Sequence, residues 1–126
     1  MLRYVREGNR RMKTIQYTKQ DLRVISREIK EGRLIAFPTD TVYGLAASAN
    51  NPMSYNKLIQ AKGRPENKPS SLMVGSVDEI ENVAVVGERE RKLIQAFMPG
   101  AVTFIFNAID DAFENHPEIK TIGIRM

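Results

Sequence analysis

Residues 34–68, LIAFPTDTVYGLAASANNPMSYNKLIQAKGRPENK, place a polar turn directly after a short apolar run. The run ends at Pro38, which has no N–H for a central ladder, and Gly44 relaxes the steric limits on the backbone. These two residues therefore bracket a turn that presents four polar side chains at a strand end. They are Thr39, Asp40, Thr41 and Tyr43.

The segment 62–68, KGRPENK, contains three cations in seven residues. Its glycine and proline oppose a regular helix, so it is expected to be a loop that follows a helix C-terminus. Arginine binds an anion with a planar fork and lysine binds it as a point charge, which makes this composition suitable for holding phosphates. The alternative is a set of exposed loop charges, at least one of which complements the helix dipole.

A chain of 126 residues fits one domain with one site. Residues 1–13 contain five of the 19 basic residues and one of the 15 acidic ones, so the net charge of +4 belongs to this end and the remainder is neutral overall. Residues 1–12 are interpreted as a basic, solvated tail, because they lack the apolar region of a secretory signal.

No apolar run approaches the ~20 residues that span a bilayer, and cysteine is absent; a cytoplasmic location without a membrane contact is expected.

Helix and strand signals alternate along residues 13–126, which predicts one α/β (α+β) unit. Leu34–Phe37 is predicted to form a strand whose two faces are both covered by other parts of the protein. Ser76 is expected to cap a helix, and the helix at 88–98 to pack Leu93, Ile94 and Phe97 along one stripe. The predicted helices cover 18–31, 53–61 and 88–98, and the predicted strands 34–37, 44–49, 71–74, 102–106 and 121–126.

The helix predicted over residues 18–31 begins with a Thr-x-x-Asp sequence that approximates a capping box, and Gly32 suits its C-terminal end. Its apolar residues recur at helical spacing and are expected to pack against a sheet. They are Leu22, Ile25 and Ile29. The charged side chains are expected to line the solvated face. They are Arg23, Arg27, Glu28 and Lys30.

Four ordered blocks carry a resemblance to a known family: PTDTVYGLA at 38–46, KGRPENKP at 62–69, PGAVT at 99–103 and TIGIR at 121–125. Together they resemble the YrdC-like L-threonylcarbamoyladenylate synthases. The resemblance implies a twisted mixed sheet with flanking helices around a deep, positively lined cavity. It covers about the N-terminal two-thirds of the family's core domain, so residues 13–126 are expected to lack the C-terminal part.

This resemblance implies a nucleotidyltransferase that joins L-threonine, bicarbonate or CO₂, and ATP into threonylcarbamoyl-AMP for tRNA threonylcarbamoyladenosine modification. It assigns Lys62 and Arg64 to catalysis. These two residues, with Lys68 and Thr121, are expected to bind the nucleotide. Mg²⁺ is expected to arrive with ATP, with no protein ligands assigned. The single histidine, His116, has no neighbouring carboxylate cluster in the sequence, which makes a transition-metal site improbable.

For L-threonine, the resemblance points to Thr41 first, then Tyr43 and Thr39, with Arg125 on the carboxylate. By chemistry alone, the turn hydroxyls are as well explained by hydrogen bonds to their own backbone. Arg125 follows an otherwise apolar strand, where a buried arginine must be paired, and a structural acid is as good a partner as a substrate. Thr103 is either core or cavity wall, and the core is favoured.

A second function from another class fits the same residues: a noncatalytic YrdC-like module that binds RNA or a nucleotide. The basic first residues and the shortened domain favour it. The expected partners are then tRNA or double-stranded RNA, in addition to the proteins that transfer the threonylcarbamoyl group to tRNA.

Overall fold

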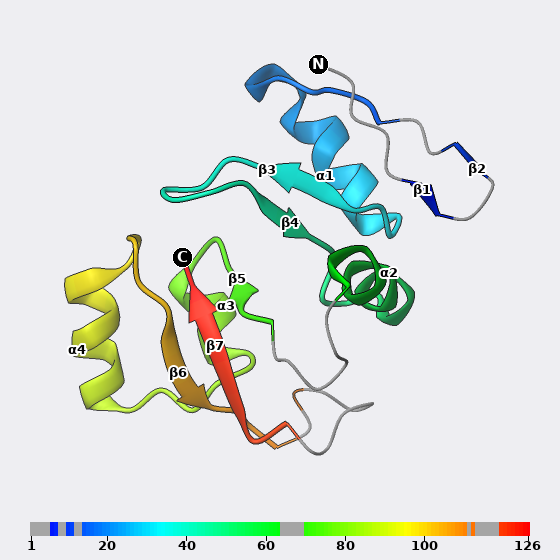
Figure 1. The fold of residues 1–126 in the computed structure, drawn as a ribbon. Helices are drawn as coiled ribbons and strands as arrows, with labels where there is room; N and C mark the ends of the chain where they lie inside the picture. The colour runs from blue at the N-terminus through cyan, green and yellow to red at the C-terminus, as the bar shows by residue number, and fades with distance from the viewer. Residues whose placement is uncertain (1–5, 8–9, 12–13, 64–69, 111, 113–118) are drawn as a thin grey trace. The chain divides into compact units, whose positions relative to one another are not determined.

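The computed structural model describes residues 6–7, 10–11, 14–63, 70–110, 112 and 119–126. The chain divides into two compact units, Met1–Arg64 and Pro65–Met126, and each is described by itself. Both contain helices and strands, so the α/β prediction is confirmed (Figure 1).

The first helix of unit 1 has the boundaries that its capping signals predict. A 3₁₀ turn, η1 (Lys19–Asp21), leads into α1 (Leu22–Lys30), and Thr18 forms the expected capping box with Asp21. Gly32 ends the helix with φ of +86°, a left-handed conformation that glycine adopts without a steric penalty.

Two side chains of α1 differ from the prediction. Glu28 is buried, with 8% of its surface exposed, and forms a short ion pair with Arg33. The expectation that Glu28 lies on the solvated face is therefore wrong, because its partner follows the helix and covers the carboxylate. Leu22 is 64% exposed and does not pack as expected, since it occupies the first turn of α1.

The polar turn of unit 1 joins two antiparallel strands, β3 (Ile35–Phe37) and β4 (Gly44–Ala46), with Phe37 paired to Gly44. Ala36 is exposed, so β3 is not covered on both faces as predicted. The turn lies at the opposite end of the hairpin from the segment that leads into the next helix (Figure 1).

Helix α2 (Pro52–Lys62) follows the hairpin. The Asn51 side chain accepts hydrogen bonds from the N–H groups of Met53 and Ser54, which caps the helix. The Lys57 ammonium donates to the Gly32 carbonyl at 3.3 Å, so the end of α1 is tied to α2.

Unit 2 is built on a three-stranded mixed sheet in which β7 lies between β5 and β6 (Figure 1). β5 pairs with β7 in parallel and β6 pairs with it antiparallel, which agrees with the mixed sheet predicted. The elements are β5 (Leu72–Met73), α3 (Val77–Glu81), α4 (Glu88–Phe97), β6 (Phe104–Asn107) and β7 (Thr121–Arg125).

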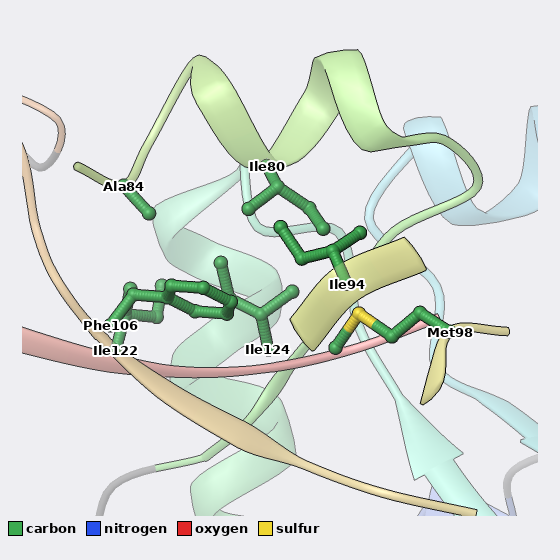
Figure 2. Packing of buried hydrophobic residues seen from close by; sticks show 7 residues of the cluster. All are labelled: Ile80, Ala84, Ile94, Met98, Phe106, Ile122 and Ile124. Carbon is green, nitrogen blue, oxygen red and sulfur yellow. The ribbon is translucent and has the colours of Figure 1, made fainter. Parts of the chain in front are cut away.

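Helices α3 and α4 cover one face of this sheet. Ile80 from α3 and Ile94 from α4 point toward Ile124 of β7, and all three are fully buried (Figure 2). Because β-strand side chains alternate between faces, Ile122 and Ile124 fill the core while Thr121, Gly123 and Arg125 face the other side. We call this second side the Arg125 face.

Two helix details differ from the sequence prediction. Ser76 occupies the position before α3, but its side chain makes no capping hydrogen bond; instead the Gly75 N–H donates to the Glu79 carboxylate at 2.6 Å. Phe97 is 56% exposed, at the last position of α4, while Ile94 takes the central place in the core.

Near the N-terminus, β1 (Arg6–Glu7) and β2 (Arg10–Arg11) form a short antiparallel ladder. Within the described parts of the chain, we find no helix with the length and apolar character needed to cross a membrane.

Candidate functional site

The turn between β3 and β4 is closed by its own first threonine. The Thr39 hydroxyl accepts a hydrogen bond from the Thr41 N–H at 3.3 Å and donates one to the Val42 carbonyl at 2.5 Å. The Thr39 and Thr41 hydroxyl oxygens are 3.4 Å apart. Of the two explanations for the turn hydroxyls, the local one therefore holds for Thr39, whose side chain shapes the loop.

The other two predicted side chains of the turn project outward. Thr41 is exposed and Tyr43 is 77% exposed, so both are accessible to a ligand. Beneath them, Gly44 is packed closely: a Cβ there would lie 3.1 Å from the Phe37 ring and 3.3 Å from the Thr39 methyl. The close packing around Gly44 thus fixes the base of the turn, while the tip of the turn carries the Thr41 hydroxyl and the Tyr43 phenol.

Lys62 is the last residue of α2 and is half-buried. Gly63 follows with φ of +58° and ends the helix through N–H bonds to the Gln60 and Ile59 carbonyls. A cation at this position also complements the helix dipole. Arg64, Lys68 and His116 lie outside the described residues.

The predicted residues of unit 2, Thr121 and Arg125, share the Arg125 face of β7. Thr121 is exposed, and Arg125 is half-buried. The strand therefore presents a hydroxyl and a guanidinium on the same side, separated by Gly123.

Thr103 also lies on the Arg125 face, so the prediction that it belongs to the core is wrong. It is exposed, and its methyl carbon lies 3.4 Å from the place that a Cβ on Gly123 would occupy. The physical reason is the alternation along β6: Phe104 and Phe106 face the helices, which turns the residue before Phe104 to the opposite side. Ser71, a residue without a predicted role, lies nearby as well, with its Cβ 3.8 Å from the same place.

The described residues hold no cluster of three or more histidine, cysteine, aspartate or glutamate side chains that could bind a metal ion. An ATP-borne Mg²⁺ without protein ligands stays a prediction.

Comparison with known proteins decides the family. Residues 27–126 match the Sua5/YciO/YrdC family model, which carries the description "Telomere recombination". The chain belongs to this family. Threonylcarbamoyl-AMP synthase from Bacillus subtilis is 35% identical over 101 residues, an alignment that covers 78% of this chain and 29% of that protein. The YrdC-like resemblance is thereby confirmed.

Solved structures of the Sua5/YciO/YrdC family agree with the fold. A double variant of Pyrococcus abyssi Sua5 aligns with a TM-score of 0.78 and 30% identity, covering 86% of this chain and 32% of that one. Pyrococcus abyssi Sua5 complexed with L-threonine aligns with a TM-score of 0.76 and 29% identity, covering 89% and 34%. The chain thus spans about a third of the length of these proteins.

Proposed function

We propose that this chain is a threonylcarbamoyl-AMP synthase-like protein that forms threonylcarbamoyl-AMP from L-threonine, bicarbonate or CO₂, and ATP, for tRNA threonylcarbamoyladenosine modification. The observation that carries the proposal is the match along residues 27–126 to this family, in which one aligned structure is a complex with L-threonine. The residues matched by the family model, 27–126, include the turn, Lys62 and the Arg125 face.

In this proposal, Thr41 and Tyr43 contact L-threonine and Thr39 holds the turn in the conformation that presents them. Arg125 binds the carboxylate, because a guanidinium fork matches carboxylate geometry. The exposure of Thr41 and Tyr43 at the turn tip and the fixed base at Gly44 support these roles.

ATP is assigned to the cations of residues 62–68. Lys62 and Arg64 neutralise the phosphate charge that develops as the α-phosphorus is attacked, and Lys68 and Thr121 add nucleotide contacts. The threonine amine first forms a carbamate with CO₂. A carbamate oxygen then attacks the α-phosphorus in line and pyrophosphate leaves, so no covalent enzyme intermediate is formed.

The test is release of pyrophosphate from ATP by the purified chain. The proposal expects release only when L-threonine and bicarbonate are both present, and its loss in Arg64→Ala. Release that is independent of L-threonine would reject the synthase assignment.

A noncatalytic RNA-binding function is the second candidate, and one observation favours it. Three of the four residues paired in the β1–β2 ladder are arginines, with Arg6 opposite Arg11. Cations that contact phosphates give an affinity that falls steeply with salt. RNA binding with such a salt slope, lost on removal of residues 1–13 and found without pyrophosphate release, would favour this function over the first.

A further inference from the structure

The charged residues of the chain are divided unequally between its two units. Unit 1 contains 13 basic and 5 acidic residues, whereas unit 2 contains 6 basic and 10 acidic ones. Residues 1–13 account for only part of this excess, because they hold five of the 13 cations. The field of a protein depends on where its charges lie, so the remaining cations of unit 1 decide whether it has a positive surface.

Four of these cations form a row along the exposed side of the first helix. Arg23, Arg27 and Lys30 follow one another at spacings of four and three residues, which places their side chains on one face of α1. Lys19, in η1, precedes Arg23 by four residues. All four residues are exposed. We call this row the α1 cationic stripe.

The carboxylates of the same segment do not neutralise the stripe. Asp21 accepts hydrogen bonds from the N–H and the hydroxyl of Thr18, and Glu28 is buried. Glu31 comes nearest, at 4.0 Å from Arg27, whose side chain is still 67% exposed. The other three cations of the stripe form no ion pair with any residue that the structure describes. Their charges can therefore act on an anion outside the chain.

Two cations of unit 1 that lie off the stripe show the contrast, because both act within the fold. Arg33 pairs with the buried Glu28. The Lys57 ammonium donates to the Gly32 carbonyl at 3.3 Å. No such contact engages Lys19, Arg23 or Lys30 among the described residues, so the stripe can change without the loss of a structural contact.

The length and chemistry of the stripe match a phosphate backbone. Eleven residues separate Lys19 from Lys30, which is about 16 Å at the rise of an α-helix. An anion that meets all four cations must be extended and charged along its length, as a nucleic acid is. Ser26 is exposed between Arg23 and Arg27, and serine hydroxyls are common donors to phosphate oxygens.

Two other anionic surfaces fit the stripe less well. A helix that lies on a membrane needs a free apolar face, but Val24, Ile25 and Ile29 are half-buried in unit 1, and Leu22 alone does not form such a face. A protein interface has an apolar centre that is poor in lysine, whereas two of the four stripe residues are lysines.

We propose that the α1 cationic stripe docks the phosphate backbone of a nucleic acid without reading its sequence. Its residues differ from those of the β1–β2 ladder and from those assigned to L-threonine and ATP. The inference therefore does not depend on the synthase reaction. It places nucleic-acid binding on a folded helix of unit 1.

The test measures binding of a labelled RNA duplex by fluorescence anisotropy between about 50 and 200 mM salt. The triple variant Arg23→Gln, Arg27→Gln, Lys30→Gln of the full chain removes three cations of the stripe. Each phosphate contact contributes about 0.9 to the slope of log affinity against log salt, so the slope should become shallower by about three. A second duplex of unrelated sequence should give the same slopes, and a DNA duplex measured in parallel distinguishes the two sources of phosphate.

The charge-matched control removes three arginines from the β1–β2 ladder, as Arg6→Gln, Arg10→Gln, Arg11→Gln. Its slope is expected to change by less than about one. Glutamine has a helix propensity close to that of arginine and lysine, so the urea midpoint of the stripe variant should equal that of wild type. Its rate of pyrophosphate release should also be unchanged.

If the triple variant fails to fold, Arg23→Gln tests the stripe alone, with Arg89→Gln on α4 as its control, because Arg89 is equally exposed. Only Arg23→Gln should make the slope shallower, by about one. Equal slopes for wild type and the stripe variants overturn the proposal, as do equal losses in stripe and control variants. Binding to phosphatidylserine vesicles that falls in the triple variant while RNA binding is kept would assign the stripe to a membrane instead. A wild-type chain that releases pyrophosphate and does not bind RNA overturns this inference alone.

Discussion

The Thr39 hydroxyl donates a hydrogen bond of 2.5 Å to the Val42 carbonyl, inside the turn that carries Thr41 and Tyr43. The same oxygen accepts from the Thr41 N–H, so one side chain fixes both ends of the loop tip. In the proposed function, Thr39 therefore acts on L-threonine only through the position of its neighbours in the turn.

Thr39→Val keeps the shape of the side chain and removes both hydrogen bonds. Since a hydrogen bond in a protein contributes about 1 kcal/mol net, we expect L-threonine affinity to fall by roughly fivefold to thirtyfold. Thr39→Ser keeps the hydroxyl and is expected to bind nearly as well as wild type. Calorimetry measures both; equal affinities for all three proteins would show that the turn needs no internal hydrogen bond.

Gly44→Ala tests the base of the turn. The added Cβ would come within 3.1 and 3.2 Å of the Phe37 ring and 3.3 Å of the Thr39 methyl, all closer than most Cβ contacts. Overpacking of this kind costs about 1–3 kcal/mol, so the free energy of unfolding should fall by that amount. Urea unfolding checks it. A variant as stable as wild type would mean that the Phe37 ring moves aside without cost.

Arg64→Ala tests the cationic segment of residues 62–68. Hydrogen bonds to charged groups contribute about 1.5–3 kcal/mol, so ATP affinity should fall by roughly 10- to 150-fold. Arg23→Ala on α1 is the control, because Arg23 is exposed and is assigned no contact with ATP. An equal loss in both variants would indicate a general effect of net charge, and no loss in either would reject the assignment of Arg64 to ATP binding.

The capping box at the start of α1 predicts a pH dependence. Hydrogen bonds from the Thr18 N–H and, secondarily, the Thr18 hydroxyl, both 2.8 Å long, lower the pKa of Asp21 below its usual 3.8. A carboxyl with a lowered folded-state pKa stabilises the fold above pH 3.8, and this contribution is lost as the pH falls through the folded-state value.

Asp21→Asn removes the titrating group. Urea midpoints of wild type are therefore expected to exceed those of the variant at pH 7 and to converge with them below the folded-state pKa. A midpoint difference that is the same at pH 7 and pH 2 would contradict the carboxylate's role.

Local signals in the sequence predicted the elements well because they act within a few residues. Thr18 forms the predicted capping box and Gly32 has the positive φ that ends the first helix, and Pro38 and Gly44 bracket the turn. The prediction that failed in the first helix involves an ion pair that helical periodicity does not encode. Glu28 is buried and pairs with Arg33, which follows the helix.

The candidate site shows the same division. Its residues stay predictions from the sequence, whereas the local role of the Thr39 side chain depends on the direction of its hydroxyl, which the structure gives. The place of Thr103 beside Gly123 depends on the register between β6 and β7, which no local pattern fixes.

The most direct test of the account is titration of L-threonine into wild type and Thr41→Val. Saturable binding to wild type, weakened at least tenfold in Thr41→Val while ATP affinity is kept, is the predicted result. Failure of wild type to bind L-threonine, or equal binding by both proteins, would contradict the claim that this turn holds the amino acid.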